Sequence, residues 1–204
     1  LKAEALCAIA HIDVATSHDD HAWDYSLQAE EIARKEGFDR VLAKALNIKA
    51  RICSLADMSP DFNRNDEGVE YLNESLKICQ DGGYETEMVD ALLCMSQIYV
   101  NKNRWNSKVV ESYYRIAGDC LDRAETIIGK SGDREPRGKV VAYRMRYFRQ
   151  GGKIEEAISY CHRILDECSD DDYLMKMQVC DFLTALYAQQ DDIAESIDYH
   201  SLCT

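Results

Sequence analysis

Two short clusters in the sequence contain residue types that could do chemistry. The first, His18-Asp19-Asp20-His21, offers potential metal ligands. A zinc site needs three or four ligands in a fixed geometry, and these all lie on one turn without another donor nearby in the sequence. An Asp at a turn before a helix is better explained as an N-cap. We therefore expect no metal and no cofactor.

The second cluster, Cys161-His162, has the residue types of a nucleophile and its base. Neighbouring residues on a helix point about 100° apart, so these two side chains would not face each other. We expect Cys161 in the core and His162 on the outer side. Nucleophile elbows, phosphate-binding loops and zinc-protease motifs are also missing from the sequence. We interpret the chain as a non-enzyme.

Composition narrows the class of protein and of partner. The formal net charge of −13 argues against binding nucleic acid or anionic membranes by this segment. No apolar run approaches the roughly 20 residues of a membrane span. The nine cysteines include no CxxC pair, and most fall on apolar helix faces. Scattered core thiols favour a reducing, cytoplasmic location.

The predicted secondary structure is clearest in Tyr143–Leu165, where the pattern indicates two helices joined by the turn Gly151-Gly152. Met145 and Phe148 share one face of the first helix. Glycine can adopt the left-handed conformation that ends a helix. The second helix carries an apolar stripe at helical spacing, made of Ile154, Ala157, Ile158, Cys161, Ile164, Leu165 and Cys168.

This pattern recurs along the chain. Cys53, Tyr99, Phe148 and Tyr187 occupy equivalent positions and are spaced by 46, 49 and 39 residues. With Phe148, Gly152 and Ala157 as its signature, the unit resembles a tetratricopeptide repeat, although the spacing exceeds the ~34 residues of that repeat and leaves room for another solenoid family. The resemblance implies an all-α, right-handed superhelix of about five helical pairs in a single domain. The expected units are 1–37, 38–83, 84–132, 138–170 and 173–204.

The same patterns predict where helices begin and end. Polar stretches at Asp57–Asp66 and Gly129–Gly138, which contain Pro60 and Pro136, are expected to be loops, and Trp105 is expected to pack on helix ends. Because the chain starts at Leu1 and stops inside a predicted helix, we interpret it as a fragment whose signal or anchor could lie elsewhere. The expected helices are 3–15, 22–35, 39–56, 67–80, 85–102 and 106–128, followed by those of the last two units.

In tetratricopeptide proteins the first helix of each pair lines a concave groove. The resemblance therefore implies a groove here for a protein or peptide segment. The segment Lys130–Lys153 holds eight Lys and Arg residues against two acids, which would suit a carboxylate or phosphate, although these cations could instead pair with neighbouring acids. The predicted groove residues are Lys44, Asn47, Arg51, Gln97, Asn101, Lys139, Arg146, Arg149, Gln150, Gln178 and Gln189.

These observations predict a protein- or peptide-binding module. Long, divergent repeats resemble the sensor or scaffold regions of bacterial signalling and transcriptional regulatory proteins. One alternative is a scaffold without a groove ligand, which would form a homodimer through the uncapped C-terminal unit. Another is a regulatory domain attached to an effector beyond Thr204. Fold resemblance alone does not decide between them.

Overall fold

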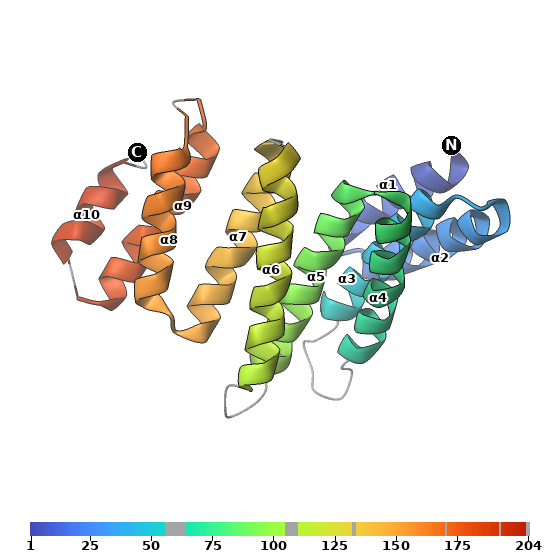
Figure 1. Cartoon of the computed structure of the whole chain (residues 1–204), viewed down its shortest axis with the longest axis horizontal. Helices are drawn as coiled ribbons and strands as arrows, with labels where there is room; N and C mark the ends of the chain where they lie inside the picture. Colours follow the sequence, from blue (N-terminus) through green and yellow to red (C-terminus); the bar gives the residue numbers. More distant parts are fainter. Residues whose placement is uncertain (56–63, 105–109, 132–133, 170, 192, 203–204) are drawn as a thin grey trace. The chain divides into compact units, whose positions relative to one another are not determined.

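The computed structural model describes residues 1–55, 64–104, 110–131, 134–169, 171–191 and 193–202 (Figure 1). These residues form ten helices and no strand, which confirms the predicted all-α helical-repeat fold. The helices are α1 (Lys2–Ala15), α2 (Asp19–Glu36), α3 (Asp39–Leu55), α4 (Asn65–Gly82), α5 (Glu85–Arg104), α6 (Glu111–Ser131), α7 (Arg134–Gly151), α8 (Ile154–Glu167), α9 (Tyr173–Gln189) and α10 (Ile193–Leu202).

Most of the predicted boundaries agree with the structure to within three residues, but the predicted loop Gly129–Gly138 is wrong, and so is the predicted helix start at 106, because α6 begins only at Glu111. Helix α6 continues to Ser131 and α7 already begins at Arg134. Pro136 lies in the first turn of α7, where a missing N–H costs no helical hydrogen bond. The loop containing Pro60 and the predicted packing of Trp105 fall outside the described residues.

Three of the turns between consecutive helices use the same left-handed closure. Gly37, Gly83 and Gly152 have φ values of 71°, 68° and 64°. In each case the next residue's N–H bonds to a carbonyl in the last helical turn; Phe38 N donates to Ala33 O at 2.9 Å, for example. These are Schellman-type ends, and they need glycine because a Cβ is disfavoured at positive φ.

The chain forms two compact units, Leu1–Val140 and Val141–Thr204, and the boundary falls within α7. In the first unit, each helix from α1 to α5 packs on the next along the chain. Helix α3 also packs on α1 and α5, whereas the backbones of the described residues of α2 and α4 stay farther apart and these two helices meet only through side chains such as Arg34 and Glu74. The first helices of the hairpins are therefore neighbours along one face.

A buried ion pair joins the first two hairpins on the opposite side. Lys49 Nζ lies 2.8 Å from Glu30 Oε2, and the two side chains are only 6% and 12% exposed. The Lys49 ammonium also lies 4.0 Å from the centre of the Tyr71 ring and 5.1 Å from that of Trp23. Cation–π attraction of this kind is strongest where water is excluded. This Lys49 cluster connects α2, α3 and α4, and the ion pair between Arg34 on α2 and Glu74 on α4, 2.7 Å long, adds a second link between the outer helices.

In the second unit, α8 is held between its neighbours by apolar and aromatic side chains. Cys161 is fully buried, which confirms its predicted place in the core. The expectation that His162 lies on the outer side is wrong. Its Nε2 is 3.2 Å from the Tyr187 hydroxyl and its Nδ1 is 3.3 Å from the Tyr199 hydroxyl, so the ring links α8 to α9 and α10.

The cysteines fill the core as the sequence predicts. Every described cysteine is a free thiol, and all of them are buried except Cys168, which is half-buried. Burial raises the pKa of the Cys53 and Cys79 thiols to about 11. Thiols with such a pKa are largely protonated at neutral pH and behave as small apolar side chains.

Candidate functional site

A row of polar side chains follows one face of α3. Arg40, Lys44, Asn47 and Arg51 recur at intervals of four, three and four residues, which places them on one side of the helix. The Arg40 and Lys44 side chains are 56% and 38% exposed, and Arg51 is partly exposed. We call Arg40, Lys44 and Arg51 the α3 cation row.

A buried carboxylate holds the first two cations of this row in place. Glu87, in the first turn of α5, is only 2% exposed. Its Oε1 accepts a hydrogen bond from Arg40 Nε at 2.9 Å and lies 3.6 Å from Lys44 Nζ. Its Oε2 is buried without a hydrogen-bond partner among the described residues. A buried charge must be compensated, so this arrangement fixes both cations against α5.

Neighbouring helices bring more charge to this face of the first unit. The pKa of His11 on α1 lies below its usual value, chiefly because of partial burial and secondly because of Arg51. Lys139 on α7 lowers the same pKa, and Asp90 on α5 opposes the shift. These effects fall off with distance. The side chains of α1, α3, α5 and the start of α7 are thus close enough to influence one charged or polar partner.

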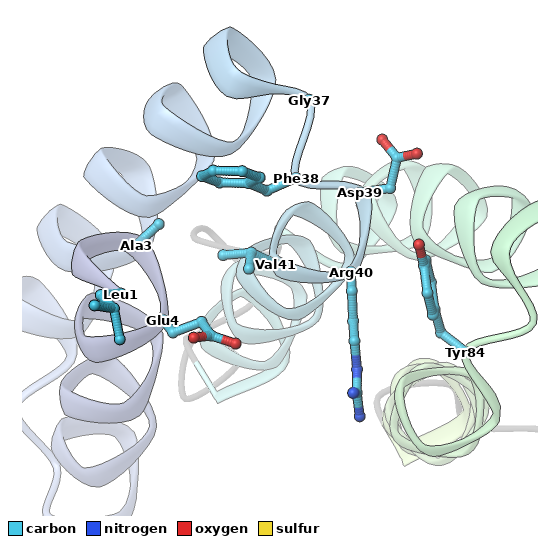
Figure 2. Close-up of a pocket in the computed structure, with 9 residues that line it drawn as sticks. All are labelled: Leu1, Ala3, Glu4, Gly37, Phe38, Asp39, Arg40, Val41 and Tyr84. Carbon is cyan, nitrogen blue, oxygen red and sulfur yellow. The ribbon is translucent and has the colours of Figure 1, made fainter.

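Beside Arg40 the surface is hollowed into a pocket of about 340 Å³ (Figure 2). It is lined by the start of α1, the turn between α2 and α3, and Tyr84 before α5. The aromatic rings of Phe38 and Tyr84 line it together with Arg40, Glu4 and Asp39. An aromatic wall with both signs of charge can accept a polar peptide side chain.

The other predicted groove residues of this unit bond within the protein. The Asn47 amide is 9% exposed; its Nδ2 donates to Glu87 O at 2.9 Å, and its Oδ1 accepts from Ser75 Oγ at 2.7 Å. It therefore joins α3, α4 and α5 and does not project from the surface. Gln97 Nε2 donates to Asn101 Oδ1 at 2.8 Å, and Asn101 Nδ2 donates to Ser54 O at 3.2 Å.

In the second unit the predicted residues lie on two helices. Arg146, Arg149 and Gln150 are exposed on α7, and Gln178 and Gln189 are exposed on α9. The described part of the chain offers Arg146 and Arg149 no carboxylate partner, although the Arg146 guanidinium lies 5.3 Å from the Tyr143 ring centre. Not every cation of the predicted patch is available, because Arg144 is 6% exposed.

The segment His18–His21 forms the start of helix α2. Helix α2 begins at Asp19, so the N-cap is His18 and the N-cap assignment to an Asp is wrong. Asp19 and Asp20 lie in the first turn, where the positive end of the helix dipole favours carboxylates. Over the described residues, no group of three or more His, Cys, Asp or Glu side chains is placed to hold a metal ion.

Sequence reasoning missed Arg40, Glu87 and His11. Arg40 precedes Lys44 by one helical turn, so the same spacing argument could have found it. Nothing in the sequence marked Glu87 as a buried carboxylate, since a carboxylate in the first turn of a helix is usually exposed. His11 was missed because the apolar pattern around it left the register of its helix ambiguous.

Comparison with known proteins does not assign this chain to a family. Neither the protein-family models nor the curated proteins searched gave a match to this chain. No described helix has both the length and the apolar character needed to cross a lipid bilayer.

Proposed function

We propose that the chain is a non-catalytic module that binds an anionic protein or peptide segment on the face formed by α1, α3 and α5. The observation that supports this most is the α3 cation row, with two cations anchored by the buried Glu87 carboxylate. In the described residues, Arg40 uses only its Nε–H for that ion pair. Its terminal N–H groups can therefore bind a carboxylate or phosphate.

Electrostatics explains why such a site would be selective. The chain as a whole has a formal net charge of −13, which repels anionic partners in general. A segment is favoured only if it places its acidic groups on the cation row and its other side chains in the adjoining pocket. Binding should weaken as salt rises, because exposed charges are screened over about 8 Å at physiological ionic strength.

The biological context of this proposal comes from the resemblance to tetratricopeptide repeats. By that resemblance the chain acts as the sensor or scaffold part of a bacterial signalling or transcriptional regulatory protein. The free, buried thiols of the described cysteines support a reducing, cytoplasmic compartment. The proposed mechanism is recognition by shape and charge, without a chemical step.

The proposal predicts a charge-dependent partner. The purified chain should capture a protein from an extract of its own cells, and Arg51→Ala should weaken that capture about tenfold or more, the scale of one lost charged contact. Arg51 suits this test because it makes no ion pair within the described residues, so its loss leaves no buried charge behind. The double variant Arg146→Ala/Arg149→Ala tests the predicted patch of the second unit in the same way.

A matched control removes similar charge elsewhere. Lys35→Ala/Lys77→Ala removes two exposed cations from α2 and α4, the second helices of their hairpins. Capture should be unchanged in this variant, and circular dichroism should show equal helicity in all of them. A partner held equally by the wild type and Arg51→Ala would contradict binding on the face of α1, α3 and α5, and a partner lost only in Arg146→Ala/Arg149→Ala would place binding on the second unit instead.

A second candidate function is self-association through the C-terminal unit. The exposed fractions of Tyr173, Leu174 and Ile197 are 74%, 64% and 61%, so this unit presents large apolar side chains to solvent. Exposed apolar patches often mark interaction sites. If this is the function, the chain should form a dimer that Leu174→Glu abolishes, and it should capture no other protein from a cell extract.

A further inference from the structure

The pocket shown in Figure 2 contains two carboxylates that come from different helices. Glu4 lies in the first turn of α1, and Asp39 is the first residue of α3. Both residues are exposed, and neither side chain forms an ion pair or a hydrogen bond with another described residue. Carboxylates of this kind at the wall of a pocket attract a positively charged group.

The positive charge of Arg40, which also lines the pocket, is already offset by a buried carboxylate. Arg40 Nε donates to Glu87 Oε1 at 2.9 Å, and the same oxygen lies 3.6 Å from Lys44 Nζ. In Figure 2 the Arg40 guanidinium group points away from the Asp39 carboxylate and the Phe38 ring. With the two pocket carboxylates included, three acidic side chains and two basic ones lie around Arg40, so this end of the α3 cation row favours a cation.

Two aromatic rings add a second attraction for a cation. The rings of Phe38 and Tyr84 line the pocket, and Phe38 is 46% exposed. The face of an aromatic ring attracts a cation that lies within about 6 Å of its centre. The Lys49 cluster shows this contact inside the same unit, where Lys49 Nζ lies 4.0 Å from the centre of the Tyr71 ring. A pocket of about 340 Å³ is large enough for a single side chain.

We propose, on the basis of the binding function given above, that the pocket holds a Lys or Arg side chain of the bound segment, while an acidic residue of the same segment pairs with Arg51. The ammonium or guanidinium group lies between the carboxylates of Glu4 and Asp39 and against the aromatic rings. Arg51 is partly exposed and makes no ion pair within the described residues, so it is available to the acidic residue.

The length of α3 sets the spacing of the two charges in the bound segment. Arg40 and Arg51 are 11 residues apart on the helix. At a rise of about 1.5 Å per residue, this separation is about 16 Å. An extended chain covers about 3.3 Å per residue, so about five residues bridge the same distance. The segment should therefore carry a basic residue about five positions from an acidic one, in either chain direction.

Selection from a phage library of random decapeptides on the immobilised, intact chain tests this proposal. The selected peptides should carry a basic and an acidic residue about five positions apart. In the tightest of them, replacing the basic residue with Gln should weaken binding about tenfold in a fluorescence-anisotropy titration, the scale of one lost charged contact. This comparison changes only the peptide, so it does not depend on the folding of a variant chain.

Glu4→Gln/Asp39→Asn tests the same contact from the side of the pocket. The double variant should also bind the selected peptide about tenfold more weakly. The Gln replacement in the peptide should then have little further effect, because both changes remove the same interaction. The control Glu31→Gln/Glu70→Gln removes equal charge from exposed positions on α2 and α4 and should leave the affinity unchanged. Circular dichroism should show equal helicity in all of these chains.

The direction of the change distinguishes this proposal from the binding function on which it rests. Selected peptides that carry only acidic residues, bind more tightly to Glu4→Gln/Asp39→Asn and are weakened by Arg51→Ala would show an anion-binding face whose pocket takes no cation. That result would overturn the present proposal and leave the binding function standing. Peptides without acidic residues that bind Arg51→Ala as well as the wild type, or a library that yields no binder, would contradict both.

Discussion

Glu30→Ala should lower the free energy of unfolding by about 3 kcal/mol, because it leaves the Lys49 ammonium buried without its partner. The Lys49 side chain is 6% exposed, and its ion pair with Glu30 measures 2.8 Å. The rings of Tyr71 and Trp23 would remain, but cation–π attraction contributes only about 2 kcal/mol even where water is excluded. Urea denaturation followed by tryptophan fluorescence measures the effect, since Trp23 lies in the Lys49 cluster.

The double variant Lys49→Met/Glu30→Leu is the control for this prediction. Replacing both members of a buried ion pair with apolar side chains is often nearly neutral, so the double variant should be more stable than Glu30→Ala. A loss of less than about 0.5 kcal/mol in Glu30→Ala, the size of an ordinary surface substitution, would show that the cluster does not stabilise the first two hairpins.

Asn47→Ala should lower the free energy of unfolding by about 2 kcal/mol, because it leaves the Glu87 carbonyl and the Ser75 hydroxyl without their hydrogen bonds to the Asn47 amide. Asn47 was predicted as a partner-binding residue, and its buried position makes it a structural one. The affinity of the folded variant for the captured partner should therefore remain close to that of the wild type. Denaturation and binding titrations on the same sample separate the two effects.

Gln97→Ala provides the comparison. Gln97 is partly exposed, and its side chain bonds only to Asn101 among the described residues. Gln97→Ala should therefore lower the free energy of unfolding by less than Asn47→Ala does. If Asn47→Ala kept its stability and lost the partner, the amide would belong to the binding surface after all.

The helices were largely predictable because each hairpin repeats the same local rules. The fifth hairpin begins at Tyr173 and its second helix at Ile193, both as predicted from apolar spacing. Glycine marked the turns at Gly37, Gly83 and Gly152 for a physical reason, since all three adopt positive φ. The boundary before α7 was wrong because Pro136 was interpreted as a loop residue, whereas proline is also accepted in the first helical turn.

The candidate site was only partly predictable, because exposure depends on the neighbouring helices. Helical spacing identified Lys44 and Arg51 correctly as residues of one face of α3. The same spacing could not show that Asn47, between them, is covered by α4 and α5, as its bonds to Ser75 and Glu87 require. The buried carboxylate of Glu87 became evident only once α5 was placed beside α3.

The most direct measurement on the proposed binding face is to locate the partner by photo-crosslinking. A photoreactive residue introduced at Gln97, on the first helix of its hairpin, should crosslink the captured partner. The same residue at Lys77, on the second helix of its hairpin, should not. Crosslinking from Lys77 and none from Gln97 would place the partner on the opposite side and contradict binding along α1, α3 and α5.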